Sequence, residues 1–281
     1  MTKTILAIFC AIAGLSVAAQ YNPTPNTIDS LIQLVTNTKD DSTKFELFMQ
    51  LGLAYGSVNV DKSVQHFNES YKLAKLFKDK NRTMSFLLTL GYTYSQIGQS
   101  AKAIEMLQEA LHYTEETKTD PSMALAFLGI NYEAQGDLKN ALDYTRKSFL
   151  IFESGLKNKT IPFDEIGYDA GPMKMGAIFE KLNQLDSAYY YAQLSYQRIL
   201  KYPAPAFYCE VCNLLGTINS RLNHHEEAIR FYQLALSKAL EVNFPSSIQE
   251  SQLALVNFFI KQACLIQPFY ILYKPMKVQK K

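Results

Sequence analysis

The sequence predicts an all-α protein, a right-handed superhelical solenoid built from antiparallel helix pairs. Three observations point to this fold class. Apolar residues make up 48% of the 281 residues, which is enough for an extended hydrophobic core. The 12 glycines and 10 prolines are too few for the turns of a many-stranded β protein or a Rossmann-type α/β fold. A pattern of glycine, aromatic and small residues recurs five times along the chain.

Residues 1–19 are typical of a signal peptide. Lys3 provides a short positively charged start, and the uncharged apolar run 5–17 follows it. Cleavage is expected after Ala18 or Ala19, where small residues precede the cut. The apolar run is shorter than the ~20 residues that a membrane span needs, so cleavage is favoured over retention as an anchor. We therefore expect an exported, periplasmic protein.

A lead-in helix and five repeats are expected after the leader. Residues 20–44 hold the lead-in helix, centred on residues 27–35, and a linker. The five repeats occupy residues 45–245. Their approximate bounds are 45–80, 84–118, 122–155, 169–202 and 209–242.

Each repeat has Leu-Gly or a variant of it in its first helix, usually followed three residues later by an aromatic residue. The second repeat is the clearest, because Gly91 and Tyr94 lead through the turn residue Gly98 to Ala103 and Leu107. The glycine and the small residues allow two helices to cross closely, and the large residues fill the space between them. The five glycines are 39, 38, 47 and 40 residues apart: Gly52, Gly91, Gly129, Gly176 and Gly216.

This pattern resembles the tetratricopeptide repeat over nearly the whole mature chain. The spacings exceed the usual ~34 residues of that family, so the second helices or the loops must be longer. Pro172 replaces the large first-helix residue of the fourth repeat and is expected in the first turn of its helix. Asn219 stands where an aromatic residue is usual. The largest insertion, around residues 154–169, is the best candidate for a hinge or a protruding loop.

Residues 246–281 are predicted to hold a degenerate sixth repeat and a basic tail. Its first helix covers 253–260, and its second helix is interrupted by Pro268 and Pro275. Nine of the eleven residues 263–273 are apolar, whereas a solenoid normally ends on a polar capping helix. Three explanations stay open for this apolar end: a homodimer interface, a docking site for a missing domain, or a translation artefact.

The order of the parts resembles the extracytoplasmic segment of repeat-containing sensor histidine kinases and related regulators of Bacteroidetes-type bacteria. In that family a transmembrane helix and a cytoplasmic kinase follow the repeats. No apolar span of sufficient length follows the leader here. The chain is therefore interpreted as a stand-alone repeat protein or as the truncated sensory portion of a two-component protein. The resemblance implies no enzymatic residues.

The charge balance argues against binding to nucleic acid. The formal net charge is +2, from 28 Lys and Arg against 26 Asp and Glu. Five of these cations lie in the two ends of the chain, at Lys3 and in the last eight residues. Without them the net charge is +2 minus 5, or −3, which indicates an ordinary mixed surface.

Motifs for catalysis are absent, and no metal or cofactor is expected. The chain lacks a phosphate-binding loop, a dinucleotide fingerprint and the common hydrolase motifs. Cys209 and Cys212 form a C-x-x-C motif inside a helical pattern, so they are predicted to face the core, with a thiol redox enzyme as the alternative. His224 and His225 are predicted in a solvated turn instead of a metal site.

The resemblance implies a concave groove lined by first-helix residues that binds a protein or peptide. The first half of this groove is apolar and rich in methionine, and the second half is polar, which suits a partner with hydrophobic anchors. The alternative is that these positions contact the interior of the superhelix and bind nothing. We therefore predict a non-enzymatic scaffold. The candidate groove residues are Met49, Tyr92, Gln96, Met123, Glu133, Met173, Lys181, Asn213, Arg221 and Asn257.

Overall fold

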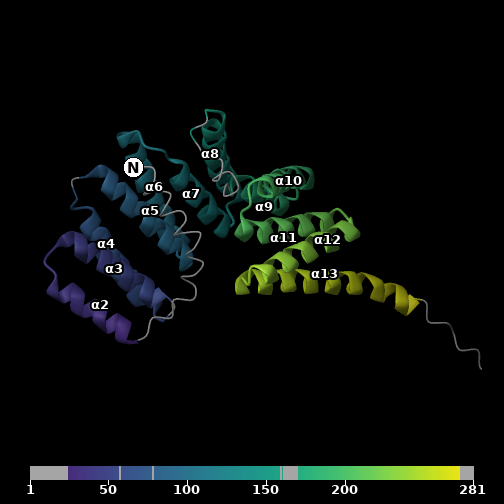
Figure 1. The fold of residues 1–281 in the computed structure, drawn as a ribbon, viewed down its shortest axis with the longest axis horizontal. Coiled ribbons are helices and arrows are strands. Elements are labelled where there is room, and N and C mark those ends of the chain that lie inside the picture. The colour runs from purple at the N-terminus through teal and green to yellow at the C-terminus, as the bar shows by residue number, and fades with distance from the viewer. Residues whose placement is uncertain (1–24, 57, 78, 159, 161–169, 273–281) are drawn as a thin grey trace, which may run out of the picture. The chain divides into compact units, whose positions relative to one another are not determined.

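The computed structural model describes residues 25–272, apart from 57, 78, 159 and 161–169. Over this range it forms twelve α-helices and no strand. Figure 1 shows how consecutive helices lie beside one another within each part of the chain. The all-helical fold class is therefore confirmed. The predicted leader, most of the predicted insertion and the basic tail lie outside the described residues. The helices are α2 (Pro25–Asn37), α3 (Asp41–Gly56), α4 (Val60–Ala74), α5 (Lys80–Gln96), α6 (Ser100–Thr117), α7 (Ser122–Ala134), α8 (Leu138–Lys157), α9 (Gly171–Lys181), α10 (Leu185–Lys201), α11 (Pro205–Arg221), α12 (His225–Glu241) and α13 (Pro245–Leu272).

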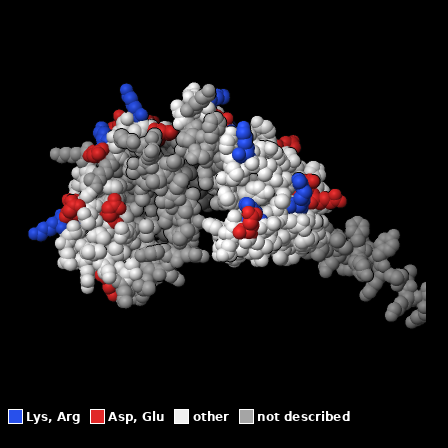
Figure 2. All heavy atoms as spheres, in the orientation of Figure 1, with Lys and Arg blue, Asp and Glu red and all other residues white. Residues whose placement is uncertain are grey.

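The chain divides into two compact units, Met1–Gln135 and Gly136–Lys281. Helices α2–α7 belong to the first unit and α8–α13 to the second. On the face drawn in Figure 2, charged side chains of both signs are interspersed over each unit and separated by uncharged areas. This distribution agrees with the mixed surface that the sequence predicts.

Local capping and backbone chemistry set the helix ends. The Asn59 side chain accepts a hydrogen bond from the Lys62 backbone amide at 3.0 Å, which caps the start of α4. Asp137 caps α8 in the same way, through the Asn140 amide at 3.1 Å. Pro172 lies in the first turn of α9, as predicted. Residues of the first turn donate no intrahelical hydrogen bond, so the absence of an amide hydrogen in proline costs nothing there.

Left-handed residues form the turns that follow α5, α7, α9 and α11. Gly98 and Gly136 have φ angles of 74° and 80°, at the turn positions that the sequence pattern predicts. Asn183 and Asn223 take the same role with φ angles of 61° and 62°. Asparagine tolerates this conformation better than most other residues with a side chain. All four turns therefore use a left-handed residue, whether it is glycine or asparagine.

The space around the repeat glycines confirms that paired helices cross closely, as predicted. A Cβ atom placed on Gly52 of α3 would lie 2.2 Å from the Phe67 ring of α4, and one placed on Gly91 of α5 would lie 2.5 Å from Leu107 of α6. Both partners are fully buried. Only a residue without a side chain therefore permits this packing.

The first unit begins with a helix that covers the first pair. Ile28 and Leu31 of α2 join a buried cluster with Leu51 and Tyr55 of α3. Helix α2 therefore buries the apolar face that α3 turns away from α4.

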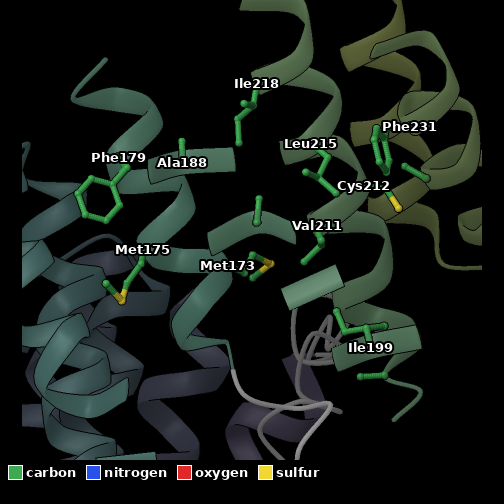
Figure 3. Close-up of a cluster of buried hydrophobic side chains, with 13 residues drawn as sticks. Met173, Met175, Phe179, Ala188, Ile199, Val211, Cys212, Leu215, Ile218 and Phe231 are labelled. Carbon is green, nitrogen blue, oxygen red and sulfur yellow. The ribbon is translucent and has the colours of Figure 1, made fainter. Parts of the chain in front are cut away.

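The second unit repeats the pairwise packing. Helix α9 packs on α10, α11 packs on α12, and α13 packs on both α11 and α12. A core cluster of this unit, drawn in Figure 3, joins residues of α9 to α12 and includes Met175, Leu215 and Phe231. Adding a Cβ atom to Gly216 would bring it 2.6 Å from the Tyr232 ring, so this pair also depends on glycine.

Helix α13 differs from the expected sixth repeat. The sequence pattern predicts a first helix over 253–260 and a separate, interrupted second helix. Instead, one helix of 28 residues runs from Pro245 to Leu272 and continues past Pro268. No glycine, asparagine or aspartate lies between Ile260 and Pro268, so nothing in that segment favours a turn. Within the described part of the chain, no helix is long and apolar enough to cross a membrane.

Candidate peptide-binding surfaces

The candidate groove residues divide equally between the two units. Met49, Tyr92, Gln96, Met123 and Glu133 lie in the first unit, and the other five lie in the second. Each unit is therefore considered on its own.

Met49 is a packing residue of the first unit and does not face a ligand. Its side chain is 5% exposed. Its sulfur accepts a hydrogen bond from the buried Ser70 hydroxyl of α4 at 3.4 Å. The assignment of Met49 to the groove is therefore wrong for this structure, because the α3–α4 interface encloses it.

Helices α5 and α7 contact each other and present a partly apolar surface. The Tyr92 ring of α5 lies 5.2 Å from the Phe127 ring of α7. Met123, Phe127 and Ile130 are spaced four and three residues apart, so they share one side of α7. Tyr92 and Met123 are half-buried, whereas 37% of Ile130 is exposed. We call Tyr92, Gln96, Met123 and Ile130 the α5–α7 face.

Polar contacts hold α5 and α7 together beside this face. The buried Asn131 side chain donates one hydrogen bond to the Ser95 hydroxyl of α5 and another to the Phe127 carbonyl oxygen at 2.8 Å. Burial raises the pKa of the Tyr92 phenol, so this ring stays neutral at physiological pH. Gln96 is exposed and Glu133 is half-buried. The α5–α7 face thus combines apolar side chains with the polar groups of Gln96 and, beside it, Glu133.

In the second unit, two of the predicted groove residues have structural roles. Met173 is 4% exposed and belongs to the core cluster of Figure 3, so its assignment to the groove is wrong. The Arg221 guanidinium of α11 donates to the carbonyl oxygen and the carboxylate of Glu180 and, at 2.6 Å, to the Asn183 side chain. Arg221 thus links α11 to the C-terminal end of α9 through both terminal nitrogens of its guanidinium.

The remaining three predicted residues lie in α9, α11 and α13, one in each helix. Lys181 and Asn257 are exposed. Asn213 is only 7% exposed, and its amide group donates a hydrogen bond to the Ser251 hydroxyl of α13 at 3.2 Å. Sequence reasoning placed Asn213 on the correct helix face but did not detect its burial, because that burial depends on α13.

Cys209 and Cys212 are core residues, as predicted. Both thiols are free and buried, with exposures of 2% and 0%. Burial raises the pKa of Cys209 and raises that of Cys212 to about 12. Reactive cysteines have the opposite property, a lowered thiol pKa at an accessible site. This environment disfavours the thiol redox alternative.

The two thiols are expected to make folding stability sensitive to alkaline pH. A thiol whose pKa is raised by folding stabilises the protein below its unfolded pKa and loses this effect as the pH rises towards the folded value. The free energy of unfolding should therefore decline as the pH rises above about 8.5, the ordinary thiol value. Urea titrations between pH 7 and pH 10 measure this decline.

A variant tests the origin of this decline. Replacing Cys212 by alanine should make the pH dependence shallower, because one of the two raised thiols is removed. An unchanged slope in Cys212→Ala would contradict the assignment. Alkylation and mass spectrometry provide a second check, since both cysteines should react with iodoacetamide in urea and resist it in the folded protein.

The histidine pair lies at the start of α12. His224 is exposed, which agrees with a solvated turn. His225 opens the helix, and its Nδ1 atom lies 2.9 Å from the Gln262 side-chain nitrogen. No cluster of three or more His, Cys, Asp or Glu side chains suited to a metal ion occurs among the residues that the structure describes.

Family models match two parts of the chain. Residues 21–112 match the model described as the SusR N-terminal TPR domain, and residues 210–237 match the model of a tetratricopeptide repeat. Tetratricopeptide repeat protein 29 of Trypanosoma brucei brucei is 23% identical over 202 residues, which cover 69% of this chain and 40% of that protein. The chain thus matches less than half the length of this curated relative.

Several solved structures have a similar helical fold. BtubC from P. vanneervenii has a TM-score of 0.60 at 14% identity, covering 82% of this chain and 91% of that one. Aspartyl phosphate phosphatase F from Bacillus subtilis has a TM-score of 0.61 at 18% identity, with coverages of 93% and 69%. A Rap protein complexed with Competence and Sporulation Factor has a TM-score of 0.58 at 14% identity, with coverages of 88% and 70%. These likenesses concern the fold alone. The chain is a tetratricopeptide repeat protein with a SusR-type N-terminal TPR domain, and neither matching family model describes an enzyme.

Proposed function

We propose that this tetratricopeptide repeat protein is a non-enzymatic scaffold that binds a protein or peptide partner through the α5–α7 face. The observation that carries the proposal is the half-buried Tyr92 ring against Phe127, with Ile130 exposed beside them. A rigid aromatic ring and flexible aliphatic side chains are typical of surfaces that accept hydrophobic anchors of a helix or an extended peptide. The Rap protein of similar fold is described in complex with a factor, which is compatible with a binding role for such helical repeats.

Selection from a random peptide library displayed on phage tests this proposal. We expect enriched peptides with two or more Leu, Ile, Phe or Met residues. The double variant Tyr92→Asp, Met123→Asp should bind them at least ~10-fold more weakly, because charges replace apolar side chains of this face. Tyr190→Asp is the matched control, since Tyr190 is 63% exposed and lies in the other unit. Equal binding by the double variant and the wild type would contradict the assignment of this face.

We also propose that the protein is exported to the periplasm. Residues 1–19 support this, because they combine a charged start, an apolar run and a small-residue cleavage pattern. After expression in a Gram-negative host, the protein should appear in the periplasmic fraction with its N-terminus at Ala19 or Gln20. Recovery of the full-length chain from the cytosol would contradict export.

The second candidate function is the sensory portion of a two-component signalling protein. What supports it is the order of the parts, because a predicted leader is followed from residue 21 by a SusR-type TPR match, as in the sensor segments that the sequence resembles. Sequencing the DNA downstream of the codon for Lys281 distinguishes the two functions. A membrane helix followed by a kinase segment in the same frame supports the sensor, and its absence supports the stand-alone scaffold.

A further inference from the structure

Helix α13 packs on α11 and α12 with one of its sides. The Ser251 hydroxyl accepts a hydrogen bond from Asn213 of α11 at 3.2 Å, and the Phe258 ring lies 5.8 Å from the Tyr232 ring of α12. Ser251 and Phe258 are both buried and lie about two helical turns apart, so they share one side of α13. In Figure 1, α11 and α12 lie on the same side of α13.

The opposite side of α13 carries an exposed row of apolar residues. Leu253, Val256 and Ile260 are 57%, 52% and 56% exposed. They are three and four residues apart, so they lie in one row along the helix. Because successive residues of a helix are rotated by about 100°, this row lies opposite Ser251 and Phe258. We call Leu253, Val256 and Ile260 the α13 stripe.

The position of α13 in the repeat pattern explains why this side is uncovered. In the pairs α3–α4, α5–α6, α9–α10 and α11–α12, a first helix packs on the second helix that follows it. Helix α13 stands in the place of a first helix, because it packs on both members of the α11–α12 pair, yet within the described residues no second helix follows it. Exposed apolar residues gathered on one side of a helix mark an interaction surface. The α13 stripe therefore fits the apolar side of another helix.

The charges beside the stripe indicate which helix fits. Glu250 and Lys261 are exposed and lie about three full helical turns apart, so they flank the same edge of the stripe near its two ends. The other edge carries Gln252 and Phe259, which are uncharged. The midpoint between Glu250 and Lys261 lies beside Val256, within the stripe. An antiparallel copy of α13 centred there would bring each glutamate opposite the lysine of the other copy.

We propose that the α13 stripe is an isologous dimer interface, on which α13 of a second copy of this chain packs antiparallel. The stripe is uncharged, so it is complementary to itself, and a two-fold axis near Val256 pairs Glu250 of each copy with Lys261 of the other. A parallel pair would instead place each of these charges against the uncharged edge. The interface goes beyond the α5–α7 face, because it lies in the other unit and its partner is a second copy instead of a peptide.

Sedimentation velocity of the full chain tests the interface. The measured mass should rise towards twice the monomer mass as the protein concentration is raised from about 1 to 100 μM. The double variant Leu253→Glu, Ile260→Glu should stay monomeric over this range with an unchanged circular dichroism spectrum, because both sites are exposed. The double variant Leu200→Glu, Leu240→Glu is the matched control, since these leucines are 52% and 56% exposed on α10 and α12. It should dimerise like the wild type.

A charge exchange tests the antiparallel orientation. Glu250→Lys should raise the dissociation constant of the dimer at least ~3-fold, because two lysines then face each other at each end of the interface. Lys261→Glu should have a similar effect through facing glutamates. The combined variant Glu250→Lys, Lys261→Glu should restore the affinity of the wild type, since it recreates both opposite-charge pairs in reverse.

Four results would overturn the proposal. A monomer at every concentration would show that the stripe serves another partner or another segment of the chain. Dimerisation that persists in Leu253→Glu, Ile260→Glu would place the interface elsewhere. Growth beyond the dimer would indicate a head-to-tail contact, and a combined charge exchange that fails to restore affinity would exclude the antiparallel pair. Failure of the phage selection leaves these measurements unaffected, because they use no peptide and no variant of the first unit.

Discussion

Replacing Phe67 by alanine is expected to lower the free energy of unfolding by about 3–5 kcal/mol. The Phe67 side chain is fully buried, lies against Gly52 of α3, and makes an edge-to-face contact with the Tyr94 ring of α5 at 5.4 Å. Its removal leaves a cavity where α3, α4 and α5 meet. Urea denaturation followed by circular dichroism measures the loss. Tyr190→Ala is the control, because Tyr190 is 63% exposed and its truncation should change stability little.

A double-mutant cycle with Gly52 tests the physical cause. Gly52→Ala alone should destabilise the protein by about 1–3 kcal/mol, because its Cβ atom would meet the buried Phe67 ring. In the Phe67→Ala background the same change should be neutral or stabilising, since the ring is absent and alanine favours a helix by up to about 1 kcal/mol. Strictly additive effects would show that helix crossing does not depend on this contact.

Replacing Leu215 by alanine is the second change with a large expected effect. Leu215 is fully buried at the centre of the core cluster in Figure 3, near Val211 and Ile218. We expect a loss of about 2–5 kcal/mol in the free energy of unfolding. Leu200→Ala is the matched control, because it removes the same atoms from a side chain that is 52% exposed.

Amide hydrogen exchange should show which helices lose protection in the Leu215→Ala variant. In a repeat protein each element contacts only its neighbours, so a core defect acts locally before the chain unfolds globally. Exchange should accelerate in α9–α12, while α3–α6 of the first unit keep the protection of the wild type. Uniform acceleration along the whole chain would contradict this locality and would indicate a single cooperative core.

The repeat register predicted some candidate groove residues correctly and others incorrectly. Tyr92 and Met123 were identified from the repeat register, and the structure places the Tyr92 ring against Phe127 of α7, the helix that also carries Met123. Arg221 was identified by the same register, yet its guanidinium forms hydrogen bonds with Glu180 and Asn183 of the same unit. A register predicts the side of a helix on which a residue lies. It does not predict the partner that a long charged side chain finds on the next helix.

Asn213 shows the same limit for a buried polar group. Its position in the repeat predicted an accessible groove residue. The continuous helix α13 covers it and supplies Ser251, so the burial of Asn213 is a property of the assembled unit.

The sequence by itself determined the helical class, the close crossing of paired helices at glycines such as Gly52 and Gly216, and the first-turn position of Pro172. These features depend on backbone sterics and on contacts within one repeat, which recur with a fixed local spacing. Only the tertiary structure decided that Met49 and Met173 are buried and that α13 is one continuous helix instead of a helix pair. Burial and helix termination depend on contacts with neighbouring helices, which lie tens of residues away in the chain and contribute no local signal to the sequence pattern.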